Sequence, residues 1–295
     1  MDPFLKRIGT GEVLLGDGAL GTMLIQRGLK SGECPEKLNI EKPELLEEIA
    51  SLYLDAGSDI ISTNTFGGHP LKLEQYSLHD KTEEINRAGI RAIRNAIKGK
   101  AYLAASCGPC GKLLKPYGDT DPEIISKGYE RQIRALIDEG ADIIYFETMI
   151  DLAEAVLGIK AAKSTAPEIP VCATMTFDFT PRGFFTVMGN AIEQAANELK
   201  TAGADVVGSN CGNGIENMVK IAGEFRKHSE LPILIQSNAG LPIVEGDRLE
   251  YAETPEFMAE RIKGMLDIGI NIIGGCCGTT PVHISEFRKV IDSYH

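Results

Sequence analysis

The stretch Asp138-Glu-Gly-Ala-Asp-Ile-Ile144 carries the signal that decides the fold. A glycine after a helical pattern suits the left-handed position at a helix end, and the two isoleucines that follow suit a buried strand. Three other segments repeat this order of residue types. They are Asp55–Ile61, Ala202–Val207 and Asp267–Ile273. A helix-to-strand junction that recurs four times predicts a chain of alternating helices and strands.

Eight short apolar runs extend this alternation over the chain, with starts about 28 to 46 residues apart. They are Val13–Gly16, Asp59–Thr63, Ala101–Ser106, Asp142–Phe146, Val171–Thr176, Asp205–Ser209, Ile233–Ser237 and Asn271–Gly274. The spacing leaves room for a helix after each run, and Pro43–Gly57 and Pro122–Gly140 have apolar residues at helical spacing. Eight such units predict an α/β fold, a single (β/α)8 TIM barrel over residues 1–295. The same alternation also allows an open doubly wound sheet.

The charge balance disfavours two classes of partner. The chain has 30 Lys and Arg against 42 Asp and Glu, a formal net charge of −12. Nucleic acids and anionic membranes bind basic surfaces, so we expect neither as a partner. The first ten residues lack the apolar core of a signal peptide, which predicts a cytoplasmic protein with reduced thiols.

Cysteines stand at the carboxyl ends of two expected strands, where barrels and open sheets carry their chemistry. Cys211 follows the sixth run, and the pair Cys276-Cys277 follows the eighth. Flanking glycines give the backbone the freedom to turn both sulfurs of the pair to one point. Three thiolates predict a Zn²⁺ site whose fourth position is open to substrate or water. The alternative is three cysteines buried in the core, where free cysteines are common.

The charge of such a centre indicates a reaction. Zn²⁺ with three thiolates carries one net negative charge, which makes it a weak Lewis acid but lets it bind and deprotonate a thiol. This favours a sulfur nucleophile that attacks an alkyl group over hydrolysis. Asn238 ends the seventh run, between the two cysteine-bearing strand ends. Its amide oxygen is a candidate fourth ligand in the absence of substrate, and a hydrogen bond to the loop backbone is the alternative role.

Four motifs resemble those of the homocysteine S-methyltransferase family. They are Gly16-Asp-Gly-Ala-Leu-Gly-Thr22, Asn64-Thr-Phe-Gly67, Gly208-Ser-Asn-Cys-Gly212 and Gly274-Gly-Cys-Cys-Gly278. The resemblance covers nearly the whole chain. The first motif is most similar to the N-terminal homocysteine-binding domain of cobalamin-dependent methionine synthase.

The resemblance implies a (β/α)8 barrel in which the three cysteines hold zinc and the homocysteine sulfur takes the fourth position. Glu147 matches the family position that binds the substrate ammonium, and Asp17, Gly18 and Ala19 match the loop that receives its carboxylate. A carboxylate that pairs with an ammonium, and backbone N–H groups that bind a carboxylate, agree with this assignment. The implied reaction is methyl transfer to homocysteine, which gives methionine.

The resemblance leaves the methyl donor open. It implies methylcobalamin bound outside this segment, with folate- and cobalamin-binding domains of the same enzyme as partners. A free-standing enzyme that uses betaine or a sulfonium donor is the alternative. The chain has no Trp, the best face for a quaternary ammonium, and this disfavours betaine.

Two other interpretations of the function compete with this one, and a second cysteine motif has alternatives of its own. Gly278-Thr-Thr280 before a helix could bind a phosphate in a lyase barrel. The cysteine cluster could instead be a closed zinc site in a non-catalytic barrel. Cys107-Gly-Pro-Cys110 spells CxxC, which is typical of a redox pair or half of a zinc site. Because loop residues follow this motif, we favour two incidental thiols.

Overall fold

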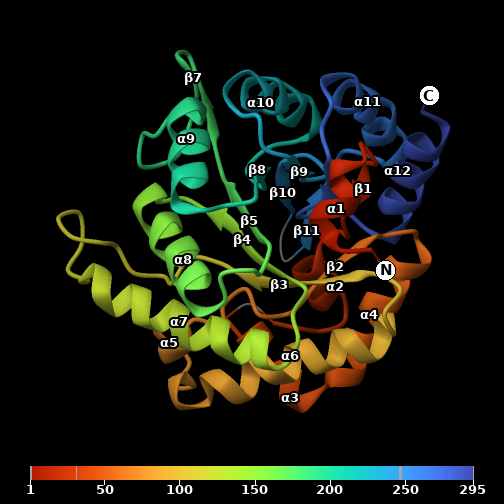
Figure 1. Ribbon diagram of the computed structural model, residues 1–295. Helices are drawn as coiled ribbons and strands as arrows, with labels where there is room; N and C mark the ends of the chain where they lie inside the picture. The colour runs from red at the N-terminus through yellow and green to blue at the C-terminus, as the bar shows by residue number, and fades with distance from the viewer. Residues whose placement is uncertain (1, 31, 246–247, 295) are drawn as a thin grey trace.

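The protein is a closed barrel of parallel strands surrounded by helices in the computed structural model, which describes residues 2–30, 32–245 and 248–294 (Figure 1). The barrel strands are β1 (Leu14–Leu15), β2 (Ile60–Ser62), β3 (Tyr102–Cys107), β4 (Ile143–Met149), β5 (Val171–Met175), β8 (Val206–Asn210), β9 (Ile233–Ser237) and β12 (Ile272–Gly275). Each overlaps one of the eight predicted runs, and β4 extends to Met149, three residues past the predicted end of its run.

The order of the strands around the sheet is β1-β12-β9-β8-β5-β4-β3-β2, and every neighbouring pair is parallel. A parallel bridge between Gly16 and Ile60 joins the two end strands. The Asp59 N–H also donates to the Leu15 carbonyl at 2.7 Å. The prediction of a barrel is therefore confirmed, and the open doubly wound alternative is wrong.

One helix follows each barrel strand on the outside, and each packs against the next (Figure 1). These are α4 (Pro43–Asp55), α6 (Thr82–Ile97), α7 (Pro122–Asp138), α8 (Leu152–Thr165), α9 (Ile192–Ala202), α10 (Ile215–His228), α11 (Pro255–Ile268) and α12 (Pro281–Ser293). Smaller elements are α1 (Phe4–Gly9), α2 (Leu20–Gln26), α3 (Leu38–Glu41), α5 (Pro70–Glu74) and the 3-10 turns Pro35–Lys37 and His79–Lys81.

The helix-to-strand junctions form as their residue types predict. Gly57, Gly140, Gly203 and Gly269 all have positive φ angles, between 81° and 109°. Gly203 and Gly269 are the left-handed C-caps of α9 and α11. This conformation suits glycine because it has no Cβ to clash with the preceding turn. Each junction turns the chain from a helix into the next strand.

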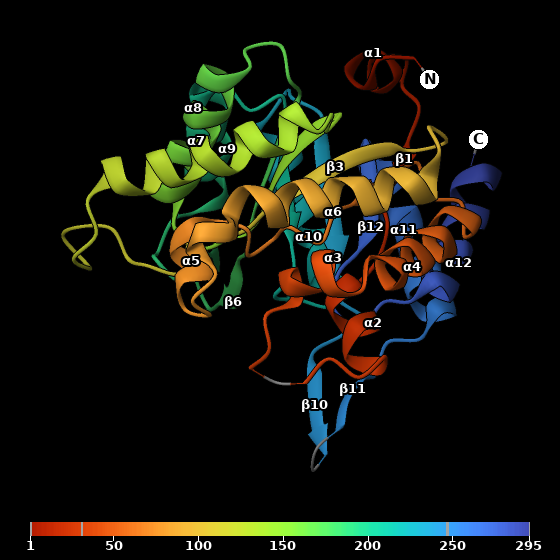
Figure 2. The same ribbon diagram turned by 90° about the horizontal axis from the view of Figure 1, so that it is seen from below.

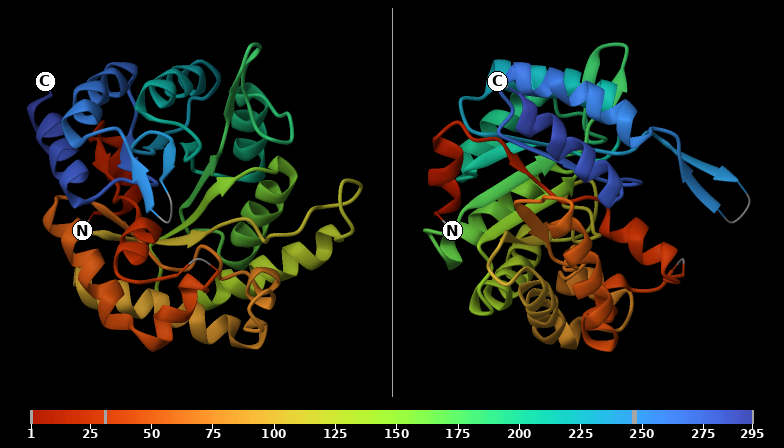
Figure 3. Two further views of the ribbon diagram at one scale, coloured as in Figure 1. Left: turned by 180° about the vertical axis from the view of Figure 1, so that it is seen from behind. Right: turned by 90° about the vertical axis from the view of Figure 1, so that its right-hand side faces the viewer.

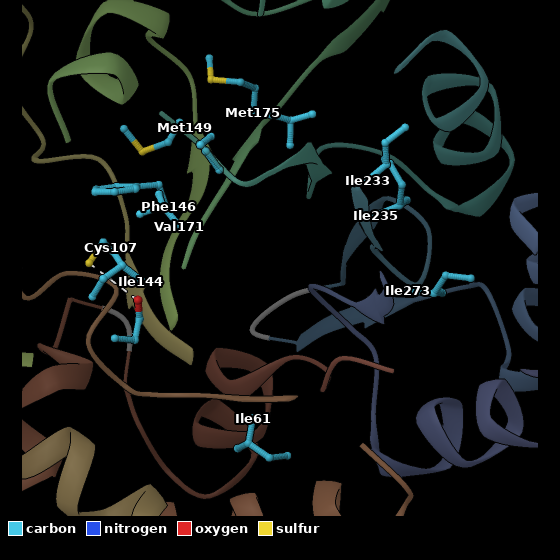
Figure 4. Close-up of a cluster of buried hydrophobic side chains, with 14 of the residues drawn as sticks. Ile61, Cys107, Ile144, Phe146, Met149, Val171, Met175, Ile233, Ile235 and Ile273 are labelled. Carbon is cyan, nitrogen blue, oxygen red and sulfur yellow. Dashed lines mark hydrogen bonds between the residues drawn. The ribbon is translucent and has the colours of Figure 1, made fainter. Parts of the chain in front are cut away.

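Apolar side chains fill two layers. Outward-facing strand residues such as Ile144, Phe146 and Ile235 pack under the helices (Figure 4). Inward-facing residues such as Tyr102, Ile143 and Leu234 form a separate cluster on the barrel axis. Phe4 and Ile8 of α1 join the axial cluster and close the barrel at the amino ends of its strands. The amino ends also carry polar residues: Asp59, Asp142 and Asp205 each accept a hydrogen bond from a backbone N–H group of a neighbouring strand.

Two β-hairpins that the sequence did not predict lie at the carboxyl ends of the strands. One consists of β6 (Asp178–Thr180) and β7 (Gly183–Phe185), and the other of β10 (Pro242–Glu245) and β11 (Arg248–Tyr251). The second hairpin projects from the barrel at the end opposite α1 (Figures 2 and 3). Within the described part of the chain, no helix has both the length and the apolar character needed to cross a membrane.

Candidate active site

A cavity of about 300 Å³ opens at the carboxyl ends of the strands. Its wall includes residues from the loops after β1, β2, β8 and β12 and from β3, β4 and β9. Asp17, Glu36 and Glu147 all line it, whereas none of the described lining residues is Lys, Arg or His. A wider depression of about 830 Å³ lies beside α1 and has none of the predicted site residues in its wall. The chemistry therefore belongs at the carboxyl ends, as predicted for a barrel.

The three predicted cysteines converge at one edge of this cavity. Their Sγ atoms all lie within 4.8 Å of one another, and those of Cys211 and Cys277 are 3.8 Å apart. A tetrahedral zinc ion with Zn–S bonds of about 2.3 Å holds its sulfurs about 3.8 Å apart. Among the described residues, no other group of three Cys, His, Asp or Glu side chains has its ligand atoms within 4.8 Å of one another. The donor set and the spacing therefore fit zinc.

Irregular backbone brings the three sulfurs together. Cys211 has a φ of 61°, in the left-handed region that non-glycine residues seldom occupy. The Cys276 N–H donates to the Ser237 carbonyl at 2.7 Å, and the Cys277 carbonyl accepts from the Ala239 N–H at 2.9 Å. These bonds tie the end of β12 to the end of β9. Both cysteines of the pair can then face Cys211, which sequential residues of a regular strand cannot do.

The thiols also affect one another's ionisation. Hydrogen bonds from Cys276 and Cys277 lower the pKa of the Cys211 thiol. The same contact with Cys211, together with burial, raises the pKa of Cys276 and Cys277. Without a cation the cluster therefore holds one negative charge most readily, whereas a bound dication would favour ionisation of all three thiols.

Asn238 lies beside the cluster. Its Oδ1 atom is buried and has no hydrogen-bond partner among the described residues. Its amide group also helps to lower the pKa of the Cys211 thiol. The loop contacts of Asn238 run through its backbone, whose N–H donates to Asn213 and whose carbonyl accepts from Ser237. A buried amide oxygen without a partner, on a side chain that contacts Cys211, is compatible with the prediction of a fourth ligand.

Two carboxyl groups, those of Asp17 and Glu147, line the cavity. Asp17 accepts from the Ser62 N–H at 2.7 Å and from its Oγ at 3.1 Å, and Glu147 accepts from the Ser106 hydroxyl. Burial raises the pKa of Asp17 to about 7. Burial and then the charge of Asp17 raise the pKa of Glu147 to about 7 as well. Because no cationic side chain of the described residues lines the cavity, a cationic ligand would relieve this unpaired charge.

The loop from Asp17 to Ala19 is held by the end of the barrel. The Ala19 N–H donates to Thr279 Oγ1 at 3.2 Å, so this N–H already has a partner. A Cβ on Gly18 would come within 2.7 Å of the same Thr279 atom and 2.9 Å of Tyr53, so only glycine fits. Ala19 is the N-cap of α2 and offers no side chain to the first turn. The N–H groups of that turn are thus the nearest additional donors for a carboxylate.

A polar network behind the cluster was not predicted. Asn210, Thr148 and Thr174 are joined by hydrogen bonds of 2.7–2.8 Å, and the Asn210 amide also contacts Cys276. Tyr145 donates to Gln236, which lies at the inner end of the cavity. The available signal was the presence of polar residues within otherwise apolar runs, since a buried polar group requires a partner.

The remaining cysteines lie elsewhere. Cys107 and Cys110 are buried in the layer between strands and helices and do not line the cavity. Burial raises the pKa of both thiols, which disfavours the reactive thiolate of a redox pair. Cys172 belongs to the axial cluster, and Cys34 donates to Glu36 at the cavity rim. None of the four joins the three-cysteine group.

Comparison with known proteins places the fold and the motifs in one family. The family model described as homocysteine S-methyltransferase matches residues 14–291. Methionine synthases of Mycobacterium tuberculosis and Mycobacterium leprae are both 34% identical, over 98% and 95% of this chain. The chain spans about a quarter of the length of these relatives, 25% and 24%.

A solved structure has the same fold. The metallated form of the Escherichia coli homocysteine methyltransferase MmuM superposes with a TM-score of 0.81 at 21% identity, covering 98% of this chain and 99% of that one. The family model extends over nearly all of the barrel, from β1 into α12, and includes every motif on which the resemblance was based. The chain belongs to the homocysteine S-methyltransferase family.

Proposed function

We propose that this chain transfers a methyl group to the thiol of homocysteine, which gives methionine. The observation that carries the proposal is the cluster of three sulfurs within 4.8 Å, in a cavity that also holds Asp17 and Glu147 and has no cation among its described lining residues. A thiol-binding metal centre and a carboxylate for an ammonium recognise two of the three polar groups of an amino-acid thiol.

Cys211, Cys276 and Cys277 are the proposed zinc ligands, and Asn238 Oδ1 is the proposed fourth ligand before homocysteine arrives. Zinc, when bound, supplies a site that lowers the pKa of an incoming thiol and keeps the sulfur nucleophilic. The chain's own part is to leave that position open toward the cavity. If homocysteine displaces Asn238, the three cysteines can remain in place as ligands.

Glu147 is the proposed partner of the substrate ammonium. Its hydrogen bond from the Ser106 hydroxyl orients the carboxylate, and the nearby Asp17 adds negative charge. The substrate carboxylate would bind at the loop Asp17–Ala19 and the first turn of α2. The Ala19 N–H is already bonded to Thr279, so Gly18 and the first turn carry more of this role. Binding at both groups would leave the sulfur end of homocysteine free to reach the metal.

We propose methylcobalamin, bound by another domain, as the methyl donor, and folate- and cobalamin-binding domains of the same enzyme as partners. The similarity to methionine synthases about four times as long supports this choice. Betaine or a sulfonium donor is less well served, because Phe66 is the one aromatic residue among the described residues of the cavity wall. A single ring makes no cage for a cation. The reduced cysteines suit the cytoplasm.

Zinc X-ray absorption with and without homocysteine tests the function. We expect three sulfur ligands and one lighter ligand in the free protein, and four sulfurs after homocysteine is added. Calorimetry near pH 7 should show release of about one proton, since a free thiol has a pKa of about 8.5. A zinc site with four protein ligands whose absorption spectrum does not change when homocysteine is added would indicate a non-catalytic zinc barrel. Absence of zinc affinity would favour a different barrel enzyme, such as a phosphate-binding lyase.

A further inference from the structure

Asn210 connects two parts of the site that the proposed function treats separately. It is the last residue of β8 and is fully buried. Its Oδ1 accepts from the Thr148 N–H and from Thr174 Oγ1, both at 2.7 Å. Its Nδ2 donates to Thr148 Oγ1 at 2.8 Å and lies 3.7 Å from Cys276 Sγ. One amide thus touches a proposed zinc ligand and the residue after Glu147.

The direction of this amide is fixed. A backbone N–H can only donate, so the side-chain atom that faces the Thr148 N–H must be the oxygen. The nitrogen therefore faces Cys276, where an N–H donor stabilises a thiolate over a thiol. Rotating the amide would place two donors against each other at Thr148 and an oxygen lone pair against the sulfur. The hydrogen bonds between Asn210 and Thr148 therefore also determine that the amide nitrogen faces Cys276.

The backbone at both ends of this network needs support. Thr148 has a φ of 56°, which is rare for a β-branched residue, and Cys211, next to Asn210, has a φ of 61°. Two of the four amide contacts of Asn210 go to Thr148. They can hold the left-handed turn that directs Glu147 into the cavity. Strained residues persist where surrounding bonds over-determine them, and they cluster at functional sites.

We propose that Asn210 is a positioning residue that keeps the proposed zinc ligands and the carboxylate of Glu147 at a fixed separation. The inference rests on the proposed function. Homocysteine spans both sites, whereas propane-1-thiol uses the sulfur site alone. A fixed separation therefore favours homocysteine over the simple thiol. Loss of the Asn210 side chain should therefore reduce both the preference for homocysteine over propane-1-thiol and the affinity for zinc.

Two substitutions separate the two contacts. Asn210→Asp retains acceptors for Thr148 and Thr174 but cannot donate to Cys276. Zinc affinity, measured by chelator competition, should fall about 10- to 100-fold, the usual effect of losing a group that supports a metal ligand. The preference for homocysteine over propane-1-thiol, measured by calorimetry on zinc-saturated protein, should stay within about twofold. Asn210→Ala should lower both, with the preference falling about tenfold or more. If Asn210→Ala does not fold, Asn210→Ser replaces it.

Asn86→Asp is the matched control. Asn86 is also fully buried, and its amide bonds the backbone of Gly68 and Thr82, away from the cavity. It should lower the melting temperature and leave zinc affinity and thiol preference unchanged. If the Asn210 variants behave like this control while the wild type binds zinc and prefers homocysteine, Asn210 is only structural and the inference is wrong. If the wild type binds neither, the proposed function fails, and the inference with it.

Discussion

The two ends of the barrel are built from the same strands but have opposite chemistry. At the amino ends, Phe4 of α1 stacks edge-on against Tyr102 with ring centroids 5.4 Å apart, and the axis is filled with apolar side chains. At the carboxyl ends the axis widens into a cavity lined by thiols, carboxyls and glycines. The closed end contributes packing energy, and the open end accepts buried polar groups and unusual backbone. Stability and chemistry should therefore be separable by mutation.

Cys277→Ala should produce the largest effect at the open end. Removing one of three ligands should abolish stoichiometric zinc binding and methyl transfer, while the fold persists on its apolar core. Zinc content and circular dichroism check this. Cys172→Ala is the control at the closed end, since Cys172 is equally a free cysteine but belongs to the axial cluster. Stoichiometric zinc in Cys277→Ala would refute the ligand assignment.

Phe4→Ala tests the closed end. Phe4 is 4% exposed, and truncating a buried phenylalanine costs about 3–5 kcal/mol of unfolding free energy. Denaturant unfolding should show this loss, while the zinc and homocysteine affinities of the folded protein stay unchanged. A large change in either affinity would show that the two ends are coupled after all.

Asp17→Asn should alter the pH dependence of stability. Burial raises the pKa of Asp17 to about 7 in the folded protein, above its unfolded value of about 3.9. The folded state thus prefers the protonated acid, and stability from this group is complete below pH 4 and declines as pH rises to 7. The unfolding free energy of wild type relative to Asp17→Asn should fall over this window by at most about 4 kcal/mol. A difference that does not vary with pH would contradict the burial of an ionisable group here.

Glu147→Gln should have the smallest effect and the most specific one. The amide keeps the shape of the side chain but loses the charge that pairs with an ammonium. Homocysteine affinity should fall about 10- to 100-fold, the range for a hydrogen bond to a charged group. Propane-1-thiol binding should change little, and calorimetry compares the two ligands. Equal losses of affinity for homocysteine and propane-1-thiol would contradict the role of Glu147 as the partner of the ammonium.

Much of the barrel could be predicted because its signals are local. Gly140 and Gly203 precede β-branched runs, and each run became a strand. The hairpins were missed because their strands are three or four residues long and lie inside loops. The sequence did not predict that helix α1 closes one end of the barrel, because its packing partners, such as Tyr102, are about a hundred residues away.

Parts of the candidate site could likewise be predicted from local sequence signals, whereas other parts could not. Cysteines at strand ends and a carboxylate after an apolar run are visible in the order of residues, and so is the family resemblance, now supported by the family model. Asn210 gave a weaker signal, because a polar residue at a strand end has many roles. Its partners Thr148 and Cys276 lie 62 and 66 residues away. No local pattern specifies which atoms such distant residues present to each other.

The sequence by itself determined the alternation of strands and helices, the cysteines at the strand ends and the family, because periodicity and glycine junctions act over a few residues. The tertiary structure alone decided that the barrel closes between Gly16 and Ile60, that three sulfurs meet within 4.8 Å, and that Asn210 bridges Thr148 and Cys276. These contacts depend on the stagger of strands around a closed sheet, which is set by the packing of all eight strands together.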